Sequence, residues 1–293
     1  MTAAHGIRLA ICKEPRQEQL ERDIVQILRE NYEDEFGEPS KDLLTAALEM
    51  MPETVPLDRQ EALVEQLAVL GESIRLSNDD EDSLAAIAAE SYGRERTRTG
   101  LTLGLRANSP PMIFTVEDEA AVAWLGEETP FWIGKHYSED LSGVIRRVAM
   151  EQGLVEGLDV REVGAAMERV LGGTFARTES YWNLLATNAV TRARNFGFVG
   201  TAGEAGLVEA EVLAMMDGRT SEQCRILDGT IYRIPDLTAQ RTAMIGATPE
   251  EAVKIAAWRK PDEIRDLSAS ELVALGVAIP PYHGNCRTIL IVR

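Results

Sequence analysis

The chain has 293 residues, 45% of them hydrophobic and 5% aromatic, and its formal net charge is −18. It is long enough for one large or two ordinary domains, and its hydrophobic content excludes a disordered chain. Residues 1–174 carry 17 Lys and Arg against 34 Asp and Glu, whereas residues 175–293 carry 13 against 14. The acidic first part repels nucleic acid, which disfavours a protein whose main role is to coat DNA.

Membrane insertion and secretion are disfavoured as well. No window reaches about 18 consecutive apolar residues, so we expect no membrane span. The apolar stretch near the N-terminus is too short, and too closely flanked by polar residues, for a secretion signal. The cysteines, Cys12, Cys224 and Cys286, are odd in number and far apart, which suits a reducing cytoplasm. A single Cys224–Cys286 bridge stays open as an alternative.

Helical periodicity dominates the first part of the chain. Residues 16–33 place Leu20, Ile24 and Leu28 on one apolar stripe. Residues 96–120 contain Gly, Asn, Ser and Pro-Pro, which predicts a loop or a short hairpin. Further helices are expected at about 41–51, 59–72 and 82–93. We therefore expect an acidic helical region over residues 1–128.

Three more helices are predicted before the composition changes. Residues 138–154 and 159–173 predict two amphipathic helices, the second ended by Gly172-Gly173. Residues 175–197 predict a long helix. Glu179 in its first turn is either an acid/base group or a residue placed at the positive end of the helix, and we favour the second interpretation.

The C-terminal part changes from helical to mixed periodicity, with strand-like runs at 207–216, 229–234 and 287–293. Thr220 and Gln223 fit a capping box, which predicts a short helix that begins at Ser221 and ends at Asp228-Gly229. Two more capping boxes open helices at Thr248–Glu251 and Ser268–Glu271. The predicted fold class is therefore α+β, with a mostly helical N-terminal region followed by a small mixed-sheet C-terminal module.

Three residues of this module offer soft ligands for a metal ion. His283 and Cys286 are three positions apart, and Cys224 lies on the predicted short helix, so the three together suit zinc. Asp228 is a candidate fourth ligand. The plainer interpretation is a buried apolar Cys224 and a His283 that satisfies a backbone carbonyl at a corner.

Signals of catalysis or of phosphate binding are weak. The patterns HExxH, GxSxG, GxGxxG and GxxxxGK[ST] do not occur, so an enzyme has no positive support. Arg192, Arg194 and Arg225 form modest basic spots, which we interpret as a solvated face. The alternative is weak contact of Arg192 and Arg194 with packaged DNA, as in a DNA-ejection factor.

Three motifs occur in a fixed order: A-R-T-E-S at 176–180, D-G-R-T-S-E-Q-C-R-I-L-D-G at 217–229 and P-P-Y-H-G-N-C-R-T-I-L-I-V at 280–292. Together they resemble the head-morphogenesis family typified by the F protein of bacteriophage Mu. The matching positions are Arg177, Thr178, Glu179, Asp217, Arg219, Thr220, Cys224, Leu227, Asp228, Gly229, Pro280, Pro281, His283, Asn285, Cys286 and Arg287.

The resemblance implies a family module over residues 129–293, with helices at 129–200 and a small sheet with inserted helices at 204–293. It implies a minor capsid protein of a tailed phage or prophage that resides in the virion head and passes through the host cytoplasm during assembly. Its implied partners are the portal protein, the major capsid protein or both, and its implied roles are head assembly and DNA delivery. The resemblance implies no enzymatic activity.

One departure from the family pattern concerns the metal. Many relatives have Cys-x-x-Cys in the central motif, which with the later His and Cys completes a four-ligand zinc set. Here Ser221 stands at the first of those positions. We therefore expect a structural corner without a cofactor, in which His283 and Cys286 hold the C-terminal strand against the Cys224 helix. Bound zinc, and a metal-dependent hydrolase or nucleic-acid enzyme that uses Cys224, His283 and Cys286, are the alternatives.

Overall fold

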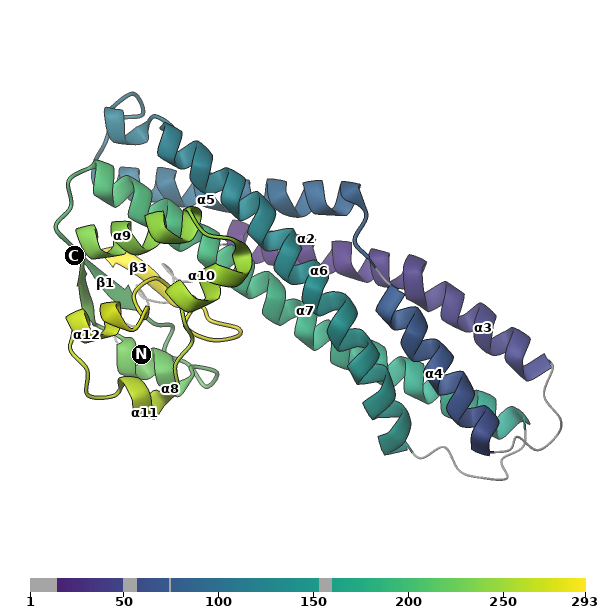
Figure 1. The fold of residues 1–293 in the computed structure, drawn as a ribbon. Helices are drawn as coiled ribbons and strands as arrows, with labels where there is room; N and C mark the ends of the chain where they lie inside the picture. Colours follow the sequence, from purple (N-terminus) through teal and green to yellow (C-terminus); the bar gives the residue numbers. More distant parts are fainter. Residues whose placement is uncertain (1–14, 50–56, 74, 153–159) are drawn as a thin grey trace. The chain divides into compact units, whose positions relative to one another are not determined.

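The computed structural model describes residues 15–49, 57–73, 75–152 and 160–293, which form mostly α-helices and three short strands (Figure 1). The α+β fold class expected from the sequence is confirmed. Internal contacts divide the chain into two compact units. The first unit comprises residues 1–22, 82–131 and 184–293, and the second comprises residues 23–81 and 132–183. The domain division expected at residue 128 stays a prediction.

The second unit is built from helices packed around aromatic side chains. In sequence order it contains residues 23–32 of α2 (Pro15–Tyr32), a π-helical turn η1 (Glu33–Gly37), α3 (Glu38–Glu49), α4 (Leu57–Ser73) and the helical residues 132–152 and 160–183. Tyr32 lies edge-on to Trp182 at 5.5 Å between ring centroids and packs on Phe36 at 5.1 Å. The predicted helix at 16–33 is confirmed, and its stripe residues Ile24 and Leu28 are buried, as expected for the apolar face of an amphipathic helix.

Three long helices contribute to the first unit: α5 (Asn78–Thr102), α6 (Val116–Gln152) and α7 (Val160–Glu204). The expected break at Gly172-Gly173 is wrong, because α7 continues through both glycines. Each interior glycine costs only about 1 kcal/mol relative to alanine, which the strong helix formers on either side can offset. The loop expected between α5 and α6 is confirmed for residues 103–115, which contain the short 3₁₀ helix η2 (Pro110–Met112).

The sheet of the first unit has three antiparallel strands in the order β2-β1-β3. These are β1 (Glu209–Leu213), β2 (Ile231–Arg233) and β3 (Ile289–Val292), so all three predicted strands are confirmed. Ala210 of β1 pairs with Tyr232 on one side and Val292 on the other. Val212 and Leu290 are fully buried in the same apolar cluster as Phe196 of α7, so the end of α7 and the sheet share one core.

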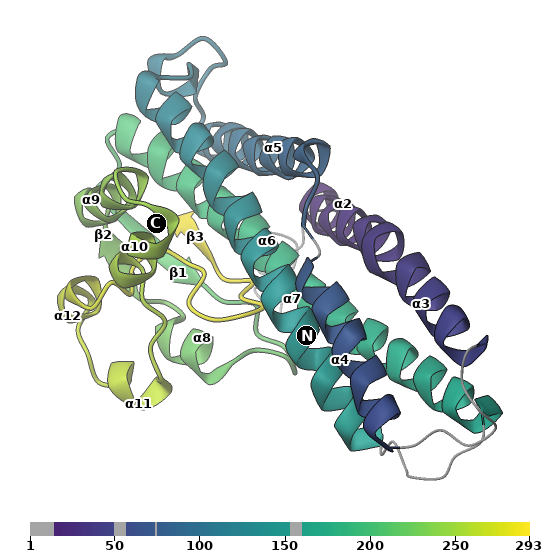
Figure 2. The same ribbon diagram turned by 45° about the vertical axis from the view of Figure 1, so that its right-hand side comes forward.

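Five short helices accompany the sheet: α8 (Glu222–Leu227), α9 (Ile234–Ile245), α10 (Pro249–Ile255), α11 (Pro261–Ile264) and α12 (Ala269–Ala274). Figure 2 shows α9 and α10 side by side. The capping boxes predicted at Thr248 and Ser268 are confirmed at the starts of α10 and α12. None of the described helices is both long and apolar enough to cross a membrane.

Candidate metal centre

Cys224 is held in place by the first turn of α8. Ser221 has extended backbone angles, and its Oγ accepts a hydrogen bond from the Cys224 backbone N–H at 3.2 Å. Ser221 is therefore the N-cap, and the expectation that Thr220 caps this helix is wrong. The Thr220 hydroxyl is engaged elsewhere, because it donates to the Met215 carbonyl and accepts from the Asp217 N–H at 2.7 Å.

The loop that carries His283 and Cys286 is fixed by α7. Thr191 donates its hydroxyl hydrogen to the Cys286 carbonyl at 2.7 Å, and the Asn195 Oδ1 accepts from the Leu290 N–H at 2.8 Å. Both α7 side chains are buried. Because loop carbonyls and N–H groups are satisfied by a rigid helix, the loop side chains are set in position rather than free to move.

The side chains of Cys224, His283 and Cys286 meet in one cluster, hereafter the metal cluster. The Cys224 Sγ lies 3.0 Å from the His283 Nε2 and 3.7 Å from the Cys286 Sγ, and all three potential ligand atoms lie within 4.8 Å of one another. The His283 Nδ1 donates to the Gly284 carbonyl. This hydrogen bond fixes the tautomer and turns Nε2 toward the sulfurs, as a backbone carbonyl bonded to the other ring nitrogen does for a metal-bound histidine.

The spacing of the two sulfurs fits a shared metal ion rather than a disulfide. Two thiolates bound at about 2.3 Å to one tetrahedral zinc ion would lie about 3.8 Å apart, close to the 3.7 Å found here. A disulfide would need about 2.05 Å, and both cysteines are free. The metal cluster can therefore hold a metal ion. Asp228 is not part of the cluster, because its carboxylate accepts from the Ala214 N–H at 2.9 Å.

Two hydroxyl groups complete the surroundings of the metal cluster. The Ser221 Oγ lies 2.7 Å from the His283 Nε2, and the Thr288 hydroxyl donates to the Cys224 Sγ at 2.9 Å. A small pocket opens here, and besides the cluster it is lined by side chains such as Arg219, Ser221 and Asn285. The described residues that line this pocket include no carboxylate, so the pocket offers no carboxylate general base.

The pKa values of the metal cluster favour one thiolate. Hydrogen bonds from Cys286, His283, Ser221 and Thr288 lower the pKa of Cys224, although burial opposes this. Burial and the neighbouring Cys224 raise the pKa of Cys286 well above its ordinary value. Burial opposes protonation of His283, but its contact with Cys224 raises its pKa overall. A metal ion would thus replace a proton shared by Cys224 and His283 and would displace a second from Cys286.

An ion pair joins the two C-terminal motifs beside the metal cluster. Arg287 donates to both carboxylate oxygens of Asp217 at 2.8 Å, and Asp217 Oδ1 also accepts from the Arg219 N–H at 2.8 Å. The hydrogen bonds from Arg287 hold the pKa of Asp217 well below its usual range. Two predicted motif residues that are 70 positions apart therefore meet directly.

The other residues predicted from the motifs either make local contacts or have side chains outside the described residues. Gly229 follows α8 with φ +77°, a conformation that only glycine adopts without strain, and the Pro281 carbonyl accepts from the Trp258 Nε1 at 3.1 Å. Arg177, Thr178 and Glu179 lie within the helical span of α7, but their side chains are outside the described residues. The expectation that Glu179 lies in the first turn of its helix, at the positive end, is wrong, because α7 begins at Val160 and continues through this position. The expected roles of Arg177 and Thr178 stay predictions.

The arginines interpreted as a solvated face differ in their surroundings. Arg192 pairs with Glu128 at 3.3 Å and Arg194 pairs with Glu95 at 3.2 Å, and the side chains in both pairs are largely buried. Arg225 donates to the backbone carbonyls of Thr220 and Asp217. The interpretation of these arginines as a solvated face is wrong for Arg192 and Arg194, and so is the DNA-contact alternative, because each guanidinium is neutralised inside the unit.

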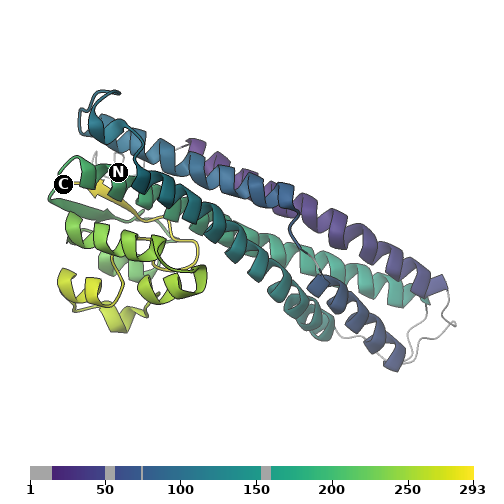
Figure 3. The same ribbon diagram turned by 45° about the horizontal axis from the view of Figure 1, so that its top comes forward.

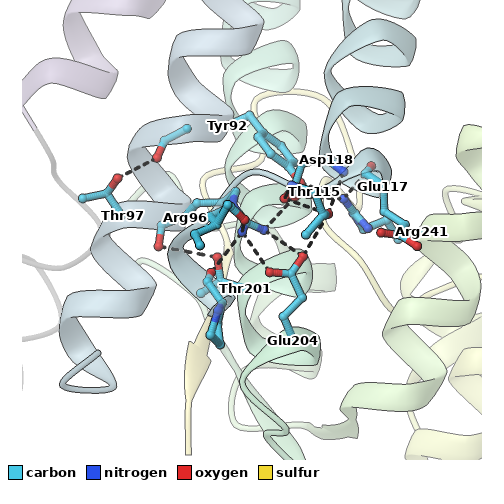
Figure 4. Close-up of polar contacts among 12 residues, drawn as sticks. Tyr92, Arg96, Thr97, Thr115, Glu117, Asp118, Thr201, Glu204 and Arg241 are labelled. Carbon is cyan, nitrogen blue, oxygen red and sulfur yellow. Dashed lines mark hydrogen bonds and ion pairs between the residues drawn. The ribbon is translucent and has the colours of Figure 1, made fainter. Parts of the chain in front are cut away.

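A second polar cluster, which sequence reasoning missed, lies in the core of the first unit (Figure 4). Arg96 of α5 donates to Asp118 of α6 at 2.6 Å and to Glu204 of α7 at 2.9 Å. Asp118 also accepts from the Tyr92 hydroxyl, and that hydroxyl accepts from Arg241 of α9 at 2.7 Å. These five residues, hereafter the ionic network, join four helices and balance two guanidinium groups with two carboxylates.

The ionic network depends on a close approach of α7 to α5, which run alongside each other in this part of the unit (Figure 3). A Cβ on Gly197 would lie 2.5 Å from the Tyr92 carbonyl oxygen, and one on Gly200 would lie 3.0 Å from the Tyr92 hydroxyl. The three-residue spacing of these glycines is a sequence signal of helix contact that could have been used. A second signal is Thr115-x-x-Asp118, which forms a cap at the start of α6.

Comparisons of the chain with models of known protein families, with curated proteins and with solved structures gave no match.

Proposed function

We propose that this chain is a minor head protein of a tailed phage or prophage, that it resides in the virion near the portal vertex, and that its C-terminal module is a structural corner closed by zinc. The observation that carries the proposal is the meeting of the two C-terminal motifs. Arg287 pairs with Asp217, and Cys224 faces His283 and Cys286. The motif residues thus have structural partners, which suits a module that shapes an assembly surface.

Zinc is the metal that the donor set favours. Two thiolates and an imidazole suit zinc, and the reducing compartment in which assembly takes place keeps both thiols available. Cys224, Cys286 and His283 Nε2 would hold the ion, and in this role zinc would link α8 to the loop before β3. Purified chain is expected to carry about one zinc, whereas a content below about 0.1 per chain would remove this part of the proposal.

A metal-dependent hydrolase is the second candidate. It is favoured by the metal cluster having three soft protein ligands, the number found in catalytic zinc sites. Against it stands the absence of a carboxylate among the described lining residues of the pocket. Hydrolase activity that requires zinc and disappears in Cys286→Ala would favour the hydrolase over the structural role.

Chemical crosslinking of purified particles tests the proposed location. Lysines from both units are available: Lys41 lies in the second unit, and Lys254 and Lys260 lie in the first, and all three are exposed. We expect crosslinks to the portal protein or the major capsid protein, and the lysine involved identifies the unit that binds. If the chain is missing from mature particles and from assembly intermediates, the proposed location is wrong.

A further inference from the structure

The two cysteines of the metal cluster differ in their access to solvent. The Cys224 side chain lines the surface pocket together with His283 and Ser221. Cys286 is fully buried and is not among the described residues that line this pocket. A reagent that enters the pocket therefore meets the Cys224 sulfur first, and the Cys286 sulfur lies only 3.7 Å from it.

The size of the pocket limits which reagents can reach Cys224. The pocket has room for about one water molecule. Each oxygen of hydrogen peroxide is the size of a water molecule, so one end of a peroxide fits while its other end stays at the mouth. A disulfide such as oxidised glutathione is far larger and does not fit. Of these two classes of thiol oxidant, the pocket therefore admits the peroxide.

The surroundings of the Cys224 sulfur suit a nucleophile. The Thr288 hydroxyl donates to this sulfur at 2.9 Å, and the His283 Nε2 lies 3.0 Å from it. Because the His283 Nδ1 donates to the Gly284 carbonyl, Nε2 is the ring nitrogen placed to accept the thiol proton. Cysteines that sense oxidants combine polar surroundings of this kind with a second cysteine within reach.

We propose that Cys224 is an oxidation site for hydrogen peroxide and that Cys286 then traps the oxidised sulfur as a Cys224–Cys286 disulfide. In the first step the Cys224 sulfur bonds to one peroxide oxygen, the O–O bond breaks, and the other oxygen leaves as water with the thiol proton. In the second step the Cys286 sulfur displaces the hydroxyl of this sulfenic acid, which leaves as water with the Cys286 proton. The two sulfurs are oxidised and the peroxide is reduced to water.

The disulfide closes the same corner that a metal ion would close. Its formation brings the two sulfurs from 3.7 Å to about 2.05 Å and joins α8 to the loop before β3. The proposal does not depend on the proposed zinc site, because the reaction takes place in a metal-free cluster. A bound zinc ion is expected to slow the reaction, since both sulfurs are then held by the metal.

Thiol counting and peptide mass spectrometry on the full chain test the proposal. A Cys12→Ser background leaves only Cys224 and Cys286 to be counted. After treatment with a chelator, hydrogen peroxide is expected to remove both free thiols and to join the two cysteine peptides of one chain. Oxidised glutathione is the matched reagent: it should leave both thiols of the folded chain intact and react with them once urea has unfolded the chain.

Single variants test the order of the two steps. Cys286→Ser is expected to stop at a sulfenic acid on Cys224, which dimedone traps, whereas Cys224→Ser is expected to keep its remaining thiol. Oxidation of Cys286 in the folded Cys224→Ser variant would contradict the assigned order. If peroxide leaves both thiols of the unsubstituted pair intact, the proposal is wrong, whether or not a variant folds. Zinc that fails to slow the oxidation would instead count against the zinc site alone.

Discussion

The first unit contains two polar clusters, the ionic network and the metal cluster, which differ in whether the chain itself supplies the partners of their polar groups. The ionic network finds its charge partners within the chain, because each guanidinium faces a carboxylate or the Tyr92 hydroxyl, although the Arg241 Nε has no hydrogen-bond partner among the described residues. The metal cluster is less complete, because the ligand atoms of two thiols and an imidazole lie within 4.8 Å of one another and have only the Ser221 and Thr288 hydroxyls as further side-chain hydrogen-bond partners in the described part of the chain. The network should therefore stabilise the fold whether or not a metal ion is present, whereas the cluster should contribute most when a metal ion is bound.

The largest effect should come from breaking the ionic network. Asp118→Ala leaves Arg241 buried without a carboxylate and leaves Arg96 with Glu204 alone, and breaking a buried ion pair in this way typically costs about 3–5 kcal/mol of unfolding free energy. Urea denaturation measures the loss. Glu204→Gln is the matched control with a smaller expected loss, because the Glu204 side chain is 26% exposed. A loss below that of Glu204→Gln would contradict the central role given to Asp118.

Removing the metal should have the next largest effect. At free zinc about 100 times Kd, bound zinc stabilises the chain by about 2.7 kcal/mol, and a chelator should remove this amount. Cys286→Ala should be insensitive to the chelator. On addition of the chelator, Asp118→Ala should lose as much unfolding free energy as the wild type, because independent sites contribute additively. If the chelator lowers the urea midpoint of Asp118→Ala and that of the wild type by different amounts, the two clusters are coupled.

The close approach of α7 to α5 should tolerate no added methyl group. Gly197→Ala places a Cβ against the Tyr92 carbonyl, a backbone atom that cannot turn away, and overpacking of this kind costs about 1–3 kcal/mol. Gly93→Ala in α5 is the control, since nothing lies within 4 Å of its Cβ, and it should be neutral or stabilising. Thermal unfolding of both variants gives the answer, and equal melting temperatures would refute the packing argument.

The smallest effect should be the pH-dependent one. The pKa of Asp217 is depressed by Arg287, so this pair contributes stability above the ordinary aspartate pKa and loses it as pH falls toward the folded-state pKa. Arg287→Gln should cost about 1 kcal/mol at pH 7, and the gap to the wild type should narrow near pH 3. Arg225→Gln, which loses only hydrogen bonds to carbonyls, should show a gap that does not change with pH.

The sequence predicted the parts of the molecule that are fixed locally. Strand runs, the capping boxes of Thr248 and Ser268 and the turn at Gly229 depend on neighbours within a few residues. The choice of cap at α8 failed by one residue, because Thr220 and Ser221 both carry hydroxyls. The groups that engage Thr220 elsewhere are the Met215 carbonyl, two residues beyond β1, and the Asp217 backbone.

Interactions between distant residues explain the other failures. Nothing near Arg96 in the sequence indicates that its partners are Asp118 and Glu204, the second 108 residues away. Likewise the burial of Arg192 and Arg194 depends on Glu128 and Glu95, which come from other helices. The metal cluster could be anticipated because its residues lie in two short motifs, but the sulfur–sulfur distance that argues for a metal required the fold.

The connection between α8 and β3 gives the metal cluster a further consequence for chain entropy. Cys224 and Cys286 are 62 residues apart, and all of α9 to α12 lies between them. Closing a loop of that length costs an unfolded chain about 4 kcal/mol. An ion bound at both ends would therefore close the segment that contains these four helices into a loop and would reduce the conformational freedom of the unfolded chain. During synthesis this loop closes only after residue 286 has been made, well after the helices it encloses.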